Sequence, residues 1–227
     1  WPVLVAVMFR LLVPIAGAGT QSSARRPAQQ GLDHRFRQIL EAPALELARQ
    51  VQCRQPVQAG PEQVRQLTAS LQAAAAQAGR PPLLIAVDQE GGQLDALGSG
   101  MTHFAGNMAL GAVDDAELAR AVGHAIGREL RALGVNVNYA PICDLNTQPR
   151  NPSLGIRSLG DEPGPAGVLA AALVSGLQAA GVAATLKHFP GKGDARVDSH
   201  YQLPLLDHSR ERLVRTELPP FQAAIGV

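Results

Sequence analysis

The chain has few of the residues that mark several special classes of protein. Its 227 residues include two cysteines, Cys53 and Cys143, and aromatic residues make up 4% of it. Two cysteines far apart in sequence make neither a disulfide scaffold nor a cysteine-rich zinc site, although one bridge between them stays open. Charge of one sign is also not in excess, since 20 lysines and arginines face 19 aspartates and glutamates. This balance gives no reason to expect nucleic acid as a partner.

The apolar stretch near the start of the chain is too broken to cross a membrane. Arg10 and Pro14 interrupt residues 2–18, whereas a membrane-spanning helix needs about 20 apolar residues in a row. We therefore expect no membrane partner. Small residues follow the stretch, so a signal-peptide remnant and a buried strand or helix both stay open. We expect a cytoplasmic protein, with export as the alternative.

Apolar residues make up 46% of the chain, and from residue 60 onward helix-like and strand-like segments alternate. The patterns predict helices at residues 61–78, 114–133 and 165–180, and a fourth from 209 to the prolines at 219 and 220. They predict strands at 83–87, 135–139 and 182–186. Such alternation is typical of an α/β fold with a parallel sheet. Residues 1–59 show no clear pattern of helices or strands. We therefore divide the chain into this first region, 1–59, and a domain at 60–227.

Three local details follow from these patterns. The continuous apolar run at 83–87 predicts a strand that is buried on both faces. Asp114, with Glu117 three residues on, predicts the N-terminal cap of the second helix. The buried stripe of that helix is expected to begin at Leu118 and to continue through Val122 and Ile126.

Charged residues follow each predicted strand. Asp88 comes directly after the first strand, Asp144 follows the second, and Lys187 and His188 follow the third. The carboxyl ends of parallel strands carry the functional sites of β/α barrels and of open parallel sheets. We therefore expect a functional site at this end of the sheet.

Three segments hold more polar and glycine residues than simple connections need. Residues 88–93 join two carboxylates to paired glycines, which suits either a tight turn close to a ligand or an acidic loop cap. Residues 151–160 present Arg157 either to sugar hydroxyls or a carboxylate, or to solvent. Residues 187–200 contain two histidines, two aspartates, two lysines and one arginine. A loop that only connects does not need so many titratable groups.

Within the third segment, Asp198 and His200 lie two positions apart. In an extended backbone both side chains project to the same side, so the carboxylate would fix the imidazole tautomer and leave one nitrogen free for proton transfer. A solvated surface pair is the alternative. A metal site built from His188, Asp194, Asp198 and His200 is another, although the lysines beside it place positive charge where a cation would bind. We expect no metal and no other cofactor.

The motifs in these segments resemble those of glycoside hydrolase family 3, in particular its bacterial β-N-acetylhexosaminidase branch. The motifs are residues 86–92, 134–141 with Asp144, Arg157 and Ser158 with Gly160, 187–191 through 198–200, and 217–221. They occur in the family's order from about residue 61 to the end of the chain.

The resemblance implies a (β/α)8 barrel of the TIM type, of which this chain would hold an incomplete part. It implies a set of residues that hold the sugar: Asp88, Arg157, Lys187 and His188. It also implies that His200 is the general acid/base of a retaining mechanism, with Asp198 as its partner. The substrate would be a terminal β-linked N-acetylglucosamine on peptidoglycan fragments, as in peptidoglycan recycling, or on chitin oligosaccharides.

The resemblance also leaves alternatives and shows departures. The Asp198–His200 loop favours a hexosaminidase over a β-glucosidase-like member, and a sugar-binding module without turnover stays open. Gln93 and Ala96 stand where family members often carry arginine. The family's aspartate nucleophile lies on a later strand that this chain lacks, so we expect the 227-residue chain alone to be inactive. An unclosed barrel exposes strand edges and apolar helix faces, so we also expect this chain to be poorly soluble or partly unfolded.

Overall fold

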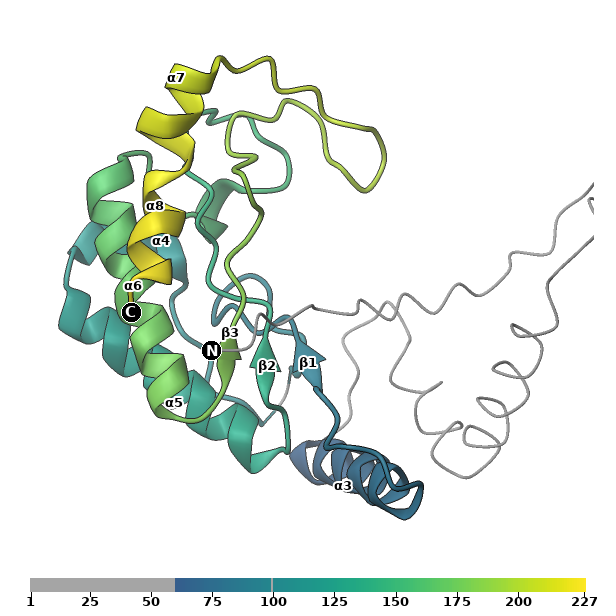
Figure 1. The fold of residues 1–227 in the computed structure, drawn as a ribbon. Coiled ribbons are helices and arrows are strands. Elements are labelled where there is room, and N and C mark those ends of the chain that lie inside the picture. The colour runs from purple at the N-terminus through teal and green to yellow at the C-terminus, as the bar shows by residue number, and fades with distance from the viewer. Residues whose placement is uncertain (1–59, 99) are drawn as a thin grey trace, which may run out of the picture. The chain divides into compact units, whose positions relative to one another are not determined.

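The computed structural model describes residues 60–98 and 100–227 (Figure 1). The expectations for residues 1–59, the apolar start among them, lie outside the described residues. The elements are α3 (Pro61–Gln77), β1 (Ala86–Val87), α4 (Asn107–Val113), α5 (Ala116–Ala132), β2 (Val137–Asn138), the 3-10 helix η1 (Gly155–Arg157), α6 (Pro163–Ala179), β3 (Ala183–Ala184), α7 (Arg210–Arg212), the π-helix η2 (Leu213–Glu217) and α8 (Pro219–Ile225). In this part of the chain, no helix combines the length and the apolar character needed to cross a membrane.

Three short parallel strands form the sheet in the order β1-β2-β3. Ala86 pairs with Val137, and Val137 pairs with Ala183, so each strand neighbours the next one along the chain. Helices α4 and α5 connect β1 to β2, and α6 lies between β2 and β3. The predicted parallel α/β class is therefore confirmed, and Figure 1 shows α5 and α6 packed together beside the sheet.

Two groups of buried side chains lie between the helices and the sheet. One joins Ile126 and Leu130 of α5 to Leu177 of α6 and to Val182 before β3. The other joins α6 to α8 around Phe221 and includes a free cysteine: Leu169, Leu173, Cys143, Leu145, Phe221. Burial, together with the neighbouring Asp144 charge, raises the pKa of the Cys143 thiol to about 12. This thiol is therefore a packing group of the core rather than a nucleophile.

The strands are shorter than the apolar patterns predicted. Residues 83–85 lie outside β1, and the Leu84 side chain is 58% exposed, so the prediction of a run buried on both faces was wrong. The Gln72 side chain donates to the Leu83 carbonyl at 3.0 Å and accepts from its N–H at 2.9 Å. Because α3 satisfies the backbone of Leu83 in this way, no neighbouring strand is needed there.

The cap of α5 lies one residue later than predicted. Asp115 caps the helix, since its carboxylate accepts from the N–H groups of Glu117 at 2.9 Å and Leu118 at 3.1 Å. Asp114 instead ends α4, a helix that the sequence pattern did not reveal, and has a φ of 53°. Leu118 is 42% exposed while Ala119 is fully buried, so the predicted buried stripe begins one position too early.

The last predicted helix is divided where prolines were expected to break it. Helix α7 runs directly into the π-helix η2, and Pro219 then begins α8. Proline suits the first turn of a helix, because an N–H group at that position would have no intrahelical partner. The two prolines therefore start a helix here rather than end one.

Helices α5 and α6 approach closely because glycines of one face the backbone of the other. A Cβ added to Gly176 would lie 2.2 Å from the Arg120 carbonyl oxygen, and one on Gly123 would lie 2.4 Å from the Leu173 carbonyl oxygen. Both distances are too short for a real side chain. The close approach of α5 and α6 therefore requires glycine, which has no Cβ, at these two positions.

We predict that Gly176→Ala lowers the free energy of unfolding by about 1–3 kcal/mol, because the added methyl group forces the helices apart. Gly164 lies in the same helix, and a Cβ added there would meet nothing within 4 Å. Gly164→Ala is the matched control and should stabilise the protein by up to about 1 kcal/mol. Urea unfolding of both variants measures the difference, and equal midpoints would contradict the prediction.

Candidate functional site

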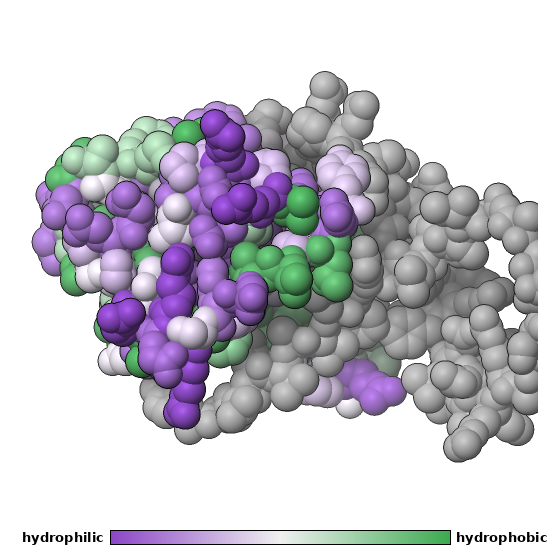
Figure 2. Space-filling view, turned by 90° about the horizontal axis from the view of Figure 1, so that it is seen from above, coloured by the Kyte–Doolittle hydropathy of each residue, from purple (hydrophilic) through white to green (hydrophobic). Residues whose placement is uncertain are grey.

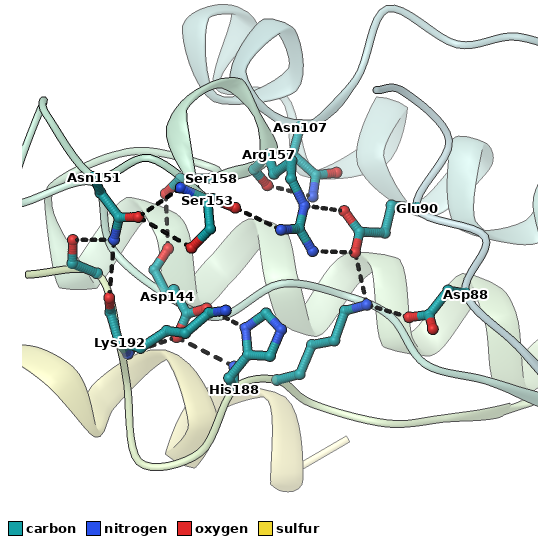
Figure 3. A network of polar contacts seen from close by, with 12 residues as sticks. Asp88, Glu90, Asn107, Asp144, Asn151, Ser153, Arg157, Ser158, His188 and Lys192 are labelled. Atoms are coloured by element: carbon teal, nitrogen blue, oxygen red, sulfur yellow. Dashed lines mark hydrogen bonds and ion pairs between the residues drawn. The ribbon is translucent and has the colours of Figure 1, made fainter. Parts of the chain in front are cut away.

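Four charged side chains form a network at the ends of β1 and β3 (Figure 3). Arg157 donates from Nε and Nη2 to the two carboxylate oxygens of Glu90, at 2.9 and 2.8 Å. Lys187 Nζ lies 2.6 Å from Glu90 Oε1 and also pairs with Asp88. The side chains of Arg157, Glu90 and Lys187 are nearly buried, whereas that of Asp88 is 45% exposed. Asp88 is thus the carboxylate of the network that a ligand reaches from solvent.

The turn after β1 places Asp88 and Glu90 in this network. Asn138 of β2 holds the residue between them, because its side chain accepts from the Gln89 N–H at 3.0 Å and donates to the Gln89 carbonyl at 2.8 Å. Gly91 follows with a φ of +80°. A Cβ on Gly92 would lie 2.6 Å from the Gly106 Cα. Glycines therefore allow the sharp turn that the sequence analysis expected near a ligand.

The partners of Glu90 keep it ionised. Burial raises its pKa, but the hydrogen bond from Arg157 and the charge of Lys187 outweigh burial, so the pKa of Glu90 lies below its ordinary value. The same hydrogen bond raises the pKa of Arg157. Two carboxylates and two cations thus balance in charge at the strand ends.

Glu90 is therefore expected to make the fold sensitive to acid. A carboxyl group with a depressed folded pKa stabilises the protein above its unfolded pKa of about 4.3, and this contribution is lost as pH falls through the folded pKa. We predict that the stability gap between the wild type and Glu90→Gln, measured by urea unfolding, narrows between about pH 7 and about pH 3.

The control for this prediction is Glu62→Gln. Glu62 pairs with Arg65 at 2.7 Å on α3, where both side chains are more than half exposed. An exposed pair contributes little to stability, so the control should match the wild type at every pH. A gap for Glu90→Gln that is constant with pH would contradict the expected role of its charge.

A second buried carboxylate, Asp144, holds the start of the loop that follows β3. Its Oδ1 accepts from the backbone N–H groups of His188 at 3.1 Å and Lys192 at 2.8 Å, and its Oδ2 lies 2.5 Å from His188 Nδ1. The Asp144 side chain is fully buried. Burial lowers the pKa of Lys192, and the Asp144 charge opposes that shift. Figure 3 shows the His188 ring between Asp144 and the group formed by Arg157 and Glu90.

The loop requires glycine where it turns away from His188. Gly191 has a φ of +120°, and its N–H donates to the His188 carbonyl at 2.8 Å. A Cβ there would lie 2.9 Å from the Cβ of the buried Glu217. Phe189 meets Phe221 of α8 edge to face, with ring centroids 5.5 Å apart. The turn is therefore fixed against η2 and α8.

The Asp198–His200 pair lies further along this loop. His200 Nδ1 is 2.6 Å from Asp198 Oδ1, which also accepts from the His200 backbone N–H at 2.9 Å. The pair therefore forms in a turn, not in the extended backbone that the sequence analysis assumed. These two bonds, and more weakly the charge of Lys192, lower the pKa of Asp198. The His200 side chain is 75% exposed.

The segment between β3 and α7 projects away from the sheet (Figure 1). Asp194 near its start and His208 near its end are 3.7 Å apart, from Oδ2 to Nε2. A cavity of about 380 Å³ opens beside them and is lined in part by Val197 and Leu203. Seen from above, the surface carries an apolar patch among hydrophilic side chains (Figure 2). The loop that carries Asp198 and His200 is open to solvent, since most of the His200 side chain is exposed.

The structure does not bring together the four residues of the alternative metal site. His188 pairs with Asp144, Asp194 lies near His208, and His200 pairs with Asp198. Among residues 60–98 and 100–227, no three His, Cys, Asp or Glu side chains converge as metal ligands do. The alternative of a metal centre at these four residues was therefore wrong.

Asp88, Arg157 and Lys187 were predicted to share one site, and the structure places all three in one network, with His188 beside it. No role was predicted for Glu90 or Asp144, although both lie in the motifs. The available signal was that both are carboxylates at strand ends. Buried carboxylates require polar partners, which Arg157 and His188 supply.

Comparisons with known proteins agree with these motifs. Residues 55–227 match the family described as "Glycosyl hydrolase family 3 N terminal domain". The chain is 44% identical over 168 residues to beta-hexosaminidase A of Pseudoalteromonas piscicida, a match that covers 72% of this chain and 28% of the relative.

Solved structures agree as well. A glycoside hydrolase family 3 β-N-acetylglucosaminidase from a Paenibacillus species matches with a TM-score of 0.72 and 54% identity, over 74% of this chain and 32% of that one. NagZ from Neisseria gonorrhoeae, in complex with N-trifluoroacetyl-D-glucosamine, matches with a TM-score of 0.66 and 34% identity, over 72% and 48%. This chain thus spans less than half the length of these relatives. Because the family match covers most of the chain, the chain belongs to glycosyl hydrolase family 3.

Proposed function

We propose that the protein carrying this chain releases terminal β-linked N-acetylglucosamine from glycans such as peptidoglycan fragments or chitin oligosaccharides. The observation that carries the proposal is the charge network of Asp88, Glu90, Arg157 and Lys187 at the strand ends, on the same chain as the Asp198–His200 pair. The names of the relatives in the family, β-hexosaminidase and β-N-acetylglucosaminidase, support this substrate class.

In this proposal the network holds the sugar by its hydroxyl groups. Asp88 accepts from hydroxyls, because its carboxylate is the exposed member of the network. Lys187, which pairs with Asp88, donates hydrogen bonds to the sugar hydroxyls. Arg157 donates from Nε and Nη2 to Glu90, and from Nη1 to the Ser153 carbonyl oxygen at 2.6 Å. Its remaining N–H groups are available to the sugar, and its main effect is to keep Glu90 and Lys187 in place.

We assign the acid/base step to His200. Its Nδ1 faces Asp198, so Nε2 is free to protonate the leaving oxygen and then to deprotonate water. An imidazole does this near neutral pH without the burial that a carboxylic acid needs. Because His200 lies on an exposed loop, the step needs the loop to fold over the bound sugar. The nucleophile of the retaining mechanism is proposed to be an aspartate of a later strand.

We further propose that the three-stranded sheet is part of a (β/α)8 barrel. Each strand neighbours the next along the chain in parallel, with helices between them. The network lies where these strands end, which is the end that carries the sites of such barrels.

The test is hydrolysis of 4-nitrophenyl β-glycosides by the full-length gene product, with isothermal titration of N-acetylglucosamine in parallel. Faster turnover of the N-acetylglucosaminide than of the glucoside supports the proposal. Preference for the glucoside would instead assign a β-glucosidase-like member. Sugar binding without turnover would identify a sugar-binding module, and the absence of both would contradict any sugar-directed function.

A further inference from the structure

Asp144 is a buried carboxylate whose side chain forms hydrogen bonds to the segment 188–192. Its Oδ1 holds the N–H groups of His188 and Lys192, and its Oδ2 faces the His188 ring. It is not one of the residues assigned above to the sugar, and its full burial removes it from any ligand in solvent. Asp144 can therefore affect the tautomer and the orientation of the His188 ring.

We infer that Asp144 is a positioning residue that fixes the tautomer of His188, an inference that rests on the proposed function and deepens it. Oδ1 already accepts two backbone N–H groups, and the charges of Lys192 and Arg157 act on the same carboxylate. The carboxylate therefore acts here as a hydrogen-bond acceptor. The ring nitrogen 2.5 Å from Oδ2 therefore carries the proton, as Nδ1–H.

This tautomer decides what the neutral ring offers a sugar. With the proton on Nδ1, the other nitrogen, Nε2, presents a lone pair and accepts a hydrogen bond. Lys187 and Arg157 nearby present only donors. One sugar hydroxyl therefore donates to His188 Nε2 while its neighbours accept from the cations. The site thereby selects a hydroxyl as a donor at one position, where a fluorine or a hydrogen would leave Nε2 without a partner.

The first experiment reads the His188 tautomer in the unsubstituted protein. Nitrogen-15 NMR of histidine-labelled full-length protein, recorded at a pH where imidazole is neutral, reports which ring nitrogen carries the proton. His188→Gln identifies the His188 signals by their loss. We expect Nδ1–H. A His188 signal with the proton on Nε2 would overturn the inference, and would do so whether or not the protein binds a sugar.

The second experiment compares Asp144→Asn with Ser158→Ala. The Ser158 hydroxyl donates to the Asp144 backbone carbonyl at 2.7 Å and is buried, so its loss disturbs the same strand end without touching the His188 ring. Asp144→Asn should mix the tautomers and weaken N-acetylglucosamine binding about tenfold, the loss expected from one charge-assisted hydrogen bond. Ser158→Ala should keep the Nδ1–H tautomer, with affinity within about twofold of the wild type.

The outcomes separate the two proposals. Equal losses in both variants would mean that Asp144 acts through local folding alone, and this would overturn the inference. Unchanged affinity in Asp144→Asn would do so too. A wild type that binds no N-acetylglucosamine, yet shows the Nδ1–H tautomer, would contradict the proposed function and leave the positioning role of Asp144 standing.

Discussion

Arg157→Ala is expected to lower the free energy of unfolding by about 3 kcal/mol, the lower end of the cost of breaking a buried ion pair, because Lys187 still contacts Glu90. Arg157 and Glu90 meet through two short hydrogen bonds, and their side chains are 14% and 3% exposed. After the substitution, Lys187 is the remaining cation in contact with the Glu90 carboxylate. Urea unfolding followed by circular dichroism measures the loss.

A matched control is Arg120→Ala. Arg120 forms a similar pair with Glu117 at 2.8 Å, but both side chains are more than half exposed. Its loss should leave the free energy of unfolding close to that of the wild type, because water replaces the partner. If both arginine variants unfold alike, the network contributes no more than a surface pair, and its charges are open to water.

The double variant Glu90→Gln with Arg157→Ala refines this prediction. If Arg157→Ala lowers the free energy of unfolding because the Glu90 charge loses its arginine partner, neutralising Glu90 recovers part of that loss of stability. Additive losses from the two single variants would instead show that Arg157 stabilises the protein through its bond to the Ser153 carbonyl or through packing. The cycle therefore separates the two contributions.

How much of this site was visible in the sequence depends on the kind of contact. Asp88 and Lys187 each follow a strand, and parallel strands end at one edge, so their meeting follows from topology. The partnership of Arg157 with Glu90 joins residues that lie 67 positions apart. No local pattern encodes such a pair. It emerges only once η1 and the turn after β1 are folded against each other.

The boundaries of helices and strands that were predicted wrongly also depend on contacts between residues far apart in the sequence. A run of apolar residues predicts a strand from residue 83, but the Gln72 side chain satisfies the backbone of Leu83, and the strand begins only at Ala86. Asp114 and Asp115 are equally good caps by residue type, and the C-terminus of the unforeseen α4 takes the first of them. In each case a contact from another element decided between two local choices of similar energy.

His200→Ala is expected to lower kcat for a β-N-acetylglucosaminide by about 10²- to 10⁴-fold, the usual contribution of a positioned general acid/base. The sugar network does not include His200, so KM should change much less than kcat. Asp198→Asn keeps an acceptor beside Nδ1 but removes the charge that stabilises the protonated ring. It should lower kcat less than His200→Ala. Steady-state kinetics of the full-length gene product measure both effects.

The chain offers a close control for this prediction. His103 Nδ1 lies 2.6 Å from Asp95 Oδ2, and its side chain is 67% exposed, so it forms another exposed histidine–aspartate pair with the same distance from Nδ1 to the carboxylate as His200 and Asp198. If an exposed pair of this kind acted by geometry alone, His103→Ala would also reduce turnover. We expect it to retain kcat within about twofold. The difference between the two variants then measures what the loop after β3, which also carries Lys187 and His188, adds to the pair. A wild-type kcat in His200→Ala would remove His200 from the reaction.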